Sequence, residues 1–404
     1  MIITKRFFKT FISSAAVFMA LSQAFSVETG GLLTNDSKLA NVEKDGSLKL
    51  DQKNGVNFWL RAPLNEEGTS YFAGEASFQT EYDTAETDSD KKLKLYADLN
   101  LFKFVFKNEL DSGNIQFSLG RFFNSDLTGL VYSQNADGLR FDANLPRVAL
   151  TLFGSYTGLL NAKTVSMLEI DSPDTTDKEK TVYVLAHKYA VGGLTFSLPH
   201  FAAGQTLSLE GLATLSLEST KYNRFYGTFA LNGPIVSPVF YSISSTIGFA
   251  KYDEQDMVKG NLSKASISVY PDFKSMSVSL NGVYASGKQG PFEAFQGFTS
   301  STAANSLSEP EYSGILKAGL SATIKPVSNL LLSAGGDVLF TTIGGEESNK
   351  IEQAGFQYSA GFNWQIVSDV SLGANFLQYI GKEDYETQFG AGKTQLKISA
   401  AIAF

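Results

Sequence analysis

Residues 394–404 alternate strictly between two kinds of side chain. One face of an extended strand receives Leu396, Ile398, Ala400, Ile402 and Phe404, and the other receives Gln395, Lys397, Ser399, Ala401 and Ala403. Successive side chains of a β-strand point to opposite faces, so the pattern predicts one apolar face and one face of polar or small residues. Such a strand suits the boundary between an apolar medium and water, although the edge strand of a soluble sheet shows the same alternation.

The beginning of the chain has the features of a secretory signal peptide. Lys5, Arg6 and Lys9 form a basic leader, and the apolar run 11–21 is too short to cross a bilayer as a helix. Ala24 and Ser26 fit the small positions that a signal peptidase reads, which predicts cleavage after Ser26. No later segment reaches the roughly 18–20 apolar residues of a membrane-spanning helix. An exported chain without such helices can cross a membrane only as a closed barrel, which pairs its backbone polar groups internally.

We therefore predict an all-β fold, a closed antiparallel transmembrane β-barrel of about 18 strands, within a range of about 16–20. The segment 394–404, which ends in Phe404, resembles the closing strand of a bacterial outer-membrane β-barrel. The resemblance implies a place in the cell outer membrane, contact with its lipid, and recognition of this strand by the barrel-assembly machinery. We divide the chain into a signal peptide (1–26), an N-terminal tail or small plug (27–45) and the barrel (46–404).

The predicted connections between strands differ at the two ends of the barrel. Short connections carry turn residues, as at Asn232–Gly233–Pro234, whereas longer ones are acidic, as at 83–92 and 161–180. This asymmetry is typical of outer-membrane barrels. A leading strand at 46–50, joined to a strand at 55–62, makes the number of strands even. A change of phase at Leu101–Phe102 predicts a β-bulge within 93–110.

Composition excludes several classes of function. The chain has no cysteine, which excludes disulfide scaffolds and thiol chemistry, and its net charge of -8 argues against nucleic acid as a partner. The two histidines, His187 and His200, have no Ser or Asp neighbour at a suggestive spacing, so we do not expect an enzyme. Acidic residues of the long loops lack the order of a calcium loop. The sequence therefore predicts no metal site and no cofactor.

Charged residues that alternate with apolar ones are expected to face the lumen, because a charge on the lipid face is costly. The predicted lining residues are Arg61, Glu75, Asp98, Arg140, Asp142, Arg147 and Arg224. Arg140, Asp142 and Arg147 lie on one hairpin and are our candidates for a charged constriction. The alternative is that these charges only pair with one another and solvate the inner wall. Arg121 shares the parity of Phe117 and Leu119, which predicts that it snorkels at the outer rim.

The longest predicted loop, 287–311, carries three aromatic residues. Phe292, Phe295 and Phe298 lie in a stretch rich in glycine and serine. Exposed aromatic rings on such a loop suggest that it folds into the barrel as a gate, where the rings would contact a substrate. The alternative is that the rings pack against other loops or the upper part of the wall.

Three short motifs are Tyr284–Ala285–Ser286–Gly287, Gly120–Arg121 and Asp137–Gly138–Leu139–Arg140. They resemble sugar and organic-acid porins of the alginate-export type, which implies a channel. The function that we expect is a porin-like outer-membrane channel through which small polar solutes diffuse along a wet lumen of mixed charge. Two alternatives stay open: a plugged transporter of hydrophobic substrates, similar to the fatty-acid transporters, and a non-conducting adhesin or structural barrel.

Overall fold

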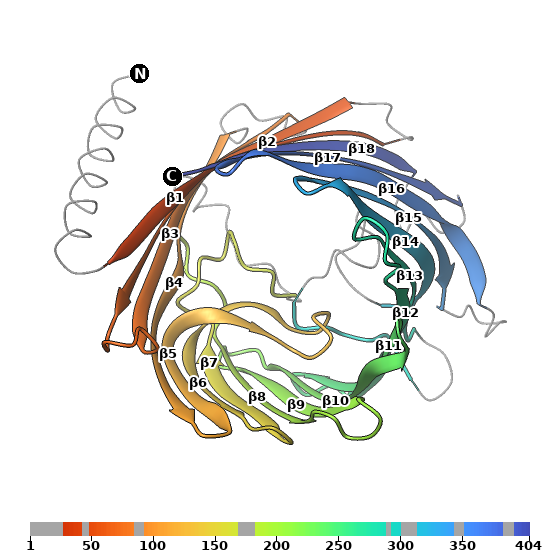
Figure 1. Ribbon diagram of the computed structural model, residues 1–404. Coiled ribbons are helices and arrows are strands. Elements are labelled where there is room, and N and C mark those ends of the chain that lie inside the picture. The colour runs from red at the N-terminus through yellow and green to blue at the C-terminus, as the bar shows by residue number, and fades with distance from the viewer. Residues whose placement is uncertain are drawn as a thin grey trace.

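The computed structural model describes residues 27–42, 48–84, 93–168, 182–287, 292–299, 313–342, 351–382 and 392–404. In these segments, eighteen strands form one antiparallel sheet that closes on itself as a barrel (Figure 1). The predicted fold class is confirmed. The strands are β1 (Glu28–Val42), β2 (Leu48–Pro63), β3 (Tyr71–Asp83), β4 (Leu93–Leu110), β5 (Gly113–Ser125), β6 (Ser133–Asn144), β7 (Ala149–Tyr156), β8 (Tyr189–Leu198), β9 (Thr206–Ser216), β10 (Tyr222–Val236), β11 (Val239–Tyr252), β12 (Val258–Val269), β13 (Ser277–Ala285), β14 (Ile315–Val327), β15 (Leu330–Thr341), β16 (Glu352–Val367), β17 (Val370–Gly381) and β18 (Lys393–Ala403).

The barrel closes between its first and last strands. β1 pairs with β18 from Leu32↔Ala403 to Val42↔Lys393, and with β2 on its other side. Phe404 completes the seam: its backbone exchanges hydrogen bonds of 2.8 and 3.0 Å with Gly31, and its ring lies over the space that a Gly31 side chain would fill.

Two predicted boundaries are therefore wrong. Residues 28–42 form a wall strand, where we expected a tail or small plug, and β2 is one continuous strand, where we expected a hairpin turn at 51–54. The outward face of β1 carries Asn35 and Ser37 between its leucines, so the apolar alternation is interrupted. The predicted even number of strands is still correct, because β1 takes the place of the expected leading strand. The predicted signal peptide lies outside the described residues and remains a prediction.

The predicted bulge in β4 is confirmed. Ala76 pairs with Leu99 and Glu75 pairs with Leu101, so Asn100 is the extra residue on β4. A bulge of this kind shifts the alternation of the strand by one residue. Both halves of β4 can therefore keep their apolar side chains on the outer face of the barrel.

The two ends of the barrel differ in the length of their connections. One end, the short-turn end, has connections such as Ser237–Pro238 and Ser368–Asp369, and the other, the long-loop end, has the connections 157–188 and 286–314. The described segments contain no helix that is long and apolar enough to cross a membrane.

Parts of three long-loop connections lie inside the barrel. The connection 126–132 curves into the enclosed space, and the segment after β7 runs inside the barrel along β3 and β4 (Figure 1). The segment 292–299 joins them through hydrogen bonds from Phe298 N and Thr299 N to Val131 O, of 2.9 and 3.0 Å. Buried aromatic residues of loops and wall form one cluster there: Tyr132, Phe153, Tyr189, Tyr226, Phe295 and Phe298. With its aliphatic members the cluster continues along the inner wall as far as β17, so the core of the described residues lies inside the lumen.

Candidate functional site

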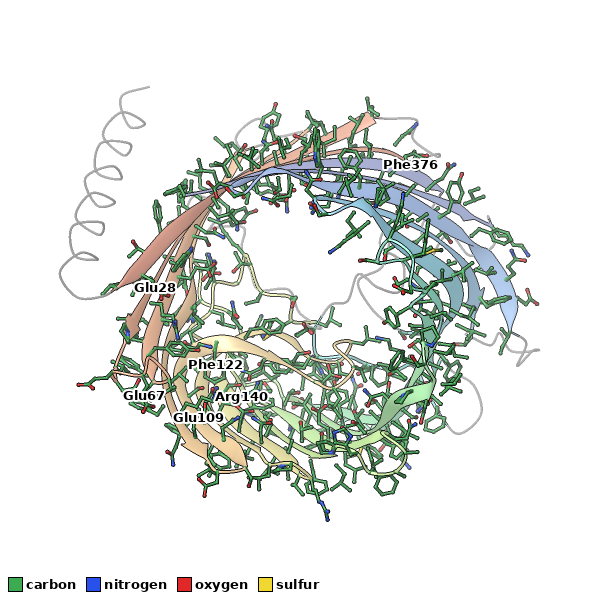
Figure 2. All side chains as sticks on the ribbon, viewed as in Figure 1. Glu28, Glu67, Glu109, Phe122, Arg140 and Phe376 are labelled. Carbon is green, nitrogen blue, oxygen red and sulfur yellow. The ribbon has the colours of Figure 1, made fainter. Side chains whose placement is uncertain are left out.

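The pairing register sorts the side chains of the wall into an outward and an inward set. Directly paired residues of antiparallel strands point to the same face, so one face can be followed from strand to strand. The outward set is apolar and exposed, as at Leu139, Phe229 and Leu280. The inward set contains Arg61, Glu75, Asp98, Arg140, Asp142 and Arg224. Figure 2 shows side chains that project from both faces of the wall.

Most inward charges of the described wall form pairs of opposite sign. Arg61 Nη1 lies 3.5 Å from Glu28 Oε2, and its guanidinium also stacks on the Tyr71 ring at 4.4 Å. Other pairs are Lys53–Glu81 at 3.3 Å, Lys397–Asp36 at 3.3 Å and Lys317–Asp337 at 3.7 Å. Paired charges make a wall hydrophilic while adding little long-range field of either sign.

The predicted constriction hairpin is only partly assembled. Arg140 Nε and Nη2 donate to the Asp142 carboxylate at 2.8 to 3.0 Å, and Thr151 Oγ1 donates to the same carboxylate at 2.7 Å. Arg140 and Asp142 are therefore one inward ion pair on β6 (Figure 2, where Arg140 is labelled). Arg147 does not join them, because it lies exposed in the turn between β6 and β7 at the short-turn end. The expectation that Arg147 helps to form a constriction is wrong for this reason.

Asp98 lines a polar cavity of about 390 Å³ between β2–β4, β6 and the segment after β7, and Glu75 contacts one of its lining residues. Charges of both signs line it: Lys53, Glu81, Asp98 and Lys163. Tyr96 OH donates to Glu81 Oε2 at 3.1 Å, and Asn100, another lining residue, donates to Glu75 Oε1 at 2.9 Å. The cavity presents both donors and acceptors, so it suits polar solutes without requiring one sign of charge.

Arg224 faces inward as predicted, but the loops cover it completely. Its exposed fraction is 0%. Nη2 donates to Leu168 O at 2.6 Å and Nη1 donates to Gly297 O at 3.2 Å, while the guanidinium stacks on the Tyr222 ring at 3.6 Å. Arg224 therefore ties two loops to β10 and is not exposed to a solute in the lumen. This corrects its predicted role as a lining residue.

The aromatic loop does fold into the barrel, but two of its three rings face the wall. Phe295 is buried and packs against Tyr226, and Phe298 is buried between Tyr132 and Tyr189. Burial also raises the pKa of the Tyr132 phenol to about 12. Phe292 is only half-buried. The geometry favours the packing alternative for Phe295 and Phe298, which anchor the loop and do not reach into the open lumen.

Arg121 has a role that the alternation pattern did not indicate. It is 4% exposed, and donates to both Asp137 carboxylate oxygens at 2.9 and 2.8 Å, to Leu99 O at 3.0 Å and to Leu159 O at 2.8 Å. β4 and β5 stop pairing at this residue. The guanidinium links β4, the β5–β6 hairpin and the segment after β7, so its predicted snorkelling at the outer rim is wrong.

Comparison with known proteins identifies the fold. No protein-family model and no curated protein matches the chain by sequence. Solved outer-membrane porins of Pseudomonas aeruginosa match it in structure. OccK9 (OpdG) matches with a TM-score of 0.62 at 10% identity, over 94% of this chain and 98% of that one. The chain has a porin fold. OccK2 (OpdF), solved in complex with glucuronate, matches with a TM-score of 0.61 at 10% identity, over 94% and 98% of the two chains. OccK11 (OpdR) matches with a TM-score of 0.58 at 12% identity, over 94% and 96%.

Proposed function

We propose that this protein is an outer-membrane channel through which small polar solutes diffuse. The observation that carries the proposal is the polarity of the wall, which is apolar on its outer face and polar, with paired charges, on its inner face. A barrel of this many strands is too wide for side chains alone to fill, so water occupies the remaining lumen. The structural likeness to porins, one of them solved with glucuronate, supports this proposal.

The loops inside the lumen would give the channel its selectivity. They lie along the wall from β3 to β12 and narrow the passage that solutes take. On this path we propose that Arg61, Glu75, Asp98, Arg140 and Asp142 contact water and solute. The polar cavity beside β2–β4 is the place where a passing solute is in contact with wall and loop together.

The location and the partners follow from the same proposal. Export requires removal of the signal peptide near Ser26, and insertion requires the barrel-assembly machinery to recognise the strand that ends in Phe404. Lipid then surrounds the apolar belt. The proposed channel is not an enzyme, because it supplies a path and performs no chemical step.

Solute flux into liposomes tests the proposal. Vesicles that contain the folded protein should swell when small polar solutes are added outside, whereas vesicles with heat-denatured protein should not. A folded barrel that admits no solute would contradict the channel. It would favour a plugged transporter or an adhesin.

A further inference from the structure

The inner wall of the barrel has a neutral region opposite its charged region. On β11–β14 the inward positions toward the short-turn end carry mainly hydroxyl and amide side chains. These groups bond to one another across strands: Ser268 Oγ and Ser279 Oγ are 2.8 Å apart, and Ser277 Oγ and Thr323 Oγ1 are 2.7 Å apart. Hydroxyl groups can each donate and accept, so the region can exchange these bonds for bonds to a solute.

A groove of about 510 Å³ lies in this region. Its lining includes Asn232, Ser242, Ser266, Ser268, Phe240 and Tyr270. Its volume lies within the range of roughly 300–1,000 Å³ that is usual for small-molecule sites. Among the residues that the structure describes, no charged side chain lines it. The nearest inward charge on β12 is Lys264, one inward position above Ser266.

Two aromatic rings stand at the short-turn end of the groove and face the lumen. Phe240 pairs with Ser268, and the same inward face continues through Ser279 and Ser321 without a register shift. The rings of Phe240 and Tyr270 are 5.6 Å apart, at 72° to each other. They are 39% and 51% exposed, whereas the lumen rings of Phe295 and Phe298 are covered by protein.

Exposed rings inside a hydrophilic lumen suit a solute with an apolar face. Contact between these rings and water is unfavourable, and lipid cannot cover them because they are on the inner face. A solute that suits the groove has an apolar face for the rings, several hydroxyls for the serines, and no charge. Sugar rings combine these features, with C–H groups on one face and hydroxyls around the edge.

We propose that the groove beside Phe240 and Tyr270 is a binding subsite for uncharged polyhydroxylated solutes of the size of a mono- or disaccharide. The inference rests on the proposed channel function and names the class of solute that the channel passes. Solutes leave the charged region near β2–β6 and associate with this neutral region before they exit at the short-turn end.

Current recordings in the presence of sugars test the subsite. Maltose, glucose and glucuronate are added separately to planar bilayers that contain the full protein, and the sugar-induced current fluctuations give an apparent dissociation constant for each. We expect neutral sugars to bind better than glucuronate. The double variant Phe240→Ala/Tyr270→Ala should weaken maltose binding by about three- to tenfold, because it removes both ring contacts.

The matched control is Phe229→Ala, which removes an outward-facing ring from the neighbouring strand β10 and should leave sugar binding unchanged. Heat-modifiability on gels checks that each variant is folded. A conducting channel that prefers glucuronate, or shows no response of the wild type to neutral sugars, overturns the subsite and leaves the channel function standing. Unchanged maltose binding in the folded double variant also overturns it. A folded wild type with no conductance overturns the channel function and the subsite together.

Discussion

Arg121 shows how one residue can close a defect in the wall. Above Phe102↔Arg121 the strands β4 and β5 separate, and the chain after β7 fills the space, with Ala97 N donating to Val182 O at 3.1 Å. The guanidinium satisfies acceptors from all three elements and neutralises Asp137. Removing it leaves a half-buried carboxylate and the Leu99 carbonyl without their donor, while the Leu159 carbonyl keeps the Tyr183 hydroxyl. This costs more than the loss of one bond.

We predict that Arg121→Gln lowers the free energy of unfolding by about 3–5 kcal/mol, the range seen when one partner of a buried ion pair is removed. Urea unfolding in lipid vesicles, followed by tryptophan fluorescence, measures this change. Arg147→Gln is the control, because an exposed turn arginine should change stability by less than about 0.5 kcal/mol. Equal urea midpoints for the two variants would show that the junction of β4, β5 and the segment after β7 does not depend on Arg121.

The Arg140–Asp142 pair decides the local charge at one point of the wall. Arg140→Ala leaves Asp142 without its cation, since the described residues provide only Thr151 as a further hydrogen-bond donor to the carboxylate. We expect the reversal potential in a salt gradient to shift toward cation selectivity, and Asp142→Asn to shift it the opposite way. The shifts should shrink at high salt because of screening. A reversal potential that neither variant changes would place the pair away from the ion path.

At the scale of elements, the loops inside the lumen depend on small residues of the wall. A side chain at Gly260 of β12 would lie 2.6 Å from the Phe295 Cα, which is backbone and cannot move aside alone. Arg224 secures the same loop from β10 through carbonyl acceptors. The position of the segment 292–299 thus depends on close packing against Gly260 and on hydrogen bonds from Arg224.

Gly260→Val should displace the segment 292–299 from the wall. The matched control is Gly227→Val, because a side chain at outward-facing Gly227 meets no atom within 4 Å. We expect single-channel recordings of the Gly260 variant to show a larger or noisier conductance, with the control like wild type. Identical recordings from both variants would mean that the loop does not limit the passage.

Arg224→Ala removes the anchor without adding bulk. The carbonyls of Leu168 and Gly297 lose their donor, and the Phe298 carbonyl keeps only the Leu168 N–H, so both loops should detach more often while the barrel remains closed. Limited proteolysis from the long-loop side should cut the variant faster than wild type. Equal rates of cleavage would contradict the anchoring role.

Elements with a regular pattern could be predicted from the sequence, and irregular ones could not. Alternation located β18 and the inward position of Arg140. A phase change at Leu101–Phe102 predicted the bulge in β4, whose extra residue is Asn100 in the structure. The strand β1 was not predicted because polar residues interrupt its outward face. The roles of Arg121 and Arg224 were not predicted because their partners come from loops far along the chain, which a strand pattern does not contain.

At the scale of the whole molecule, the barrel combines an apolar outside, a polar inside and loops that fold into the lumen (Figures 1 and 2). Charges of opposite sign are paired along the wall, so we expect the proposed channel to select by contact at the loops and inner wall more than by a strong field. The proposed function requires the remaining lumen to be an open aqueous path.

Single-channel conductance of the purified, folded protein in a planar bilayer tests whether this path is open. We predict stepwise, reproducible openings whose conductance rises with salt concentration. A folded, heat-modifiable barrel that shows no openings at any voltage would contradict it.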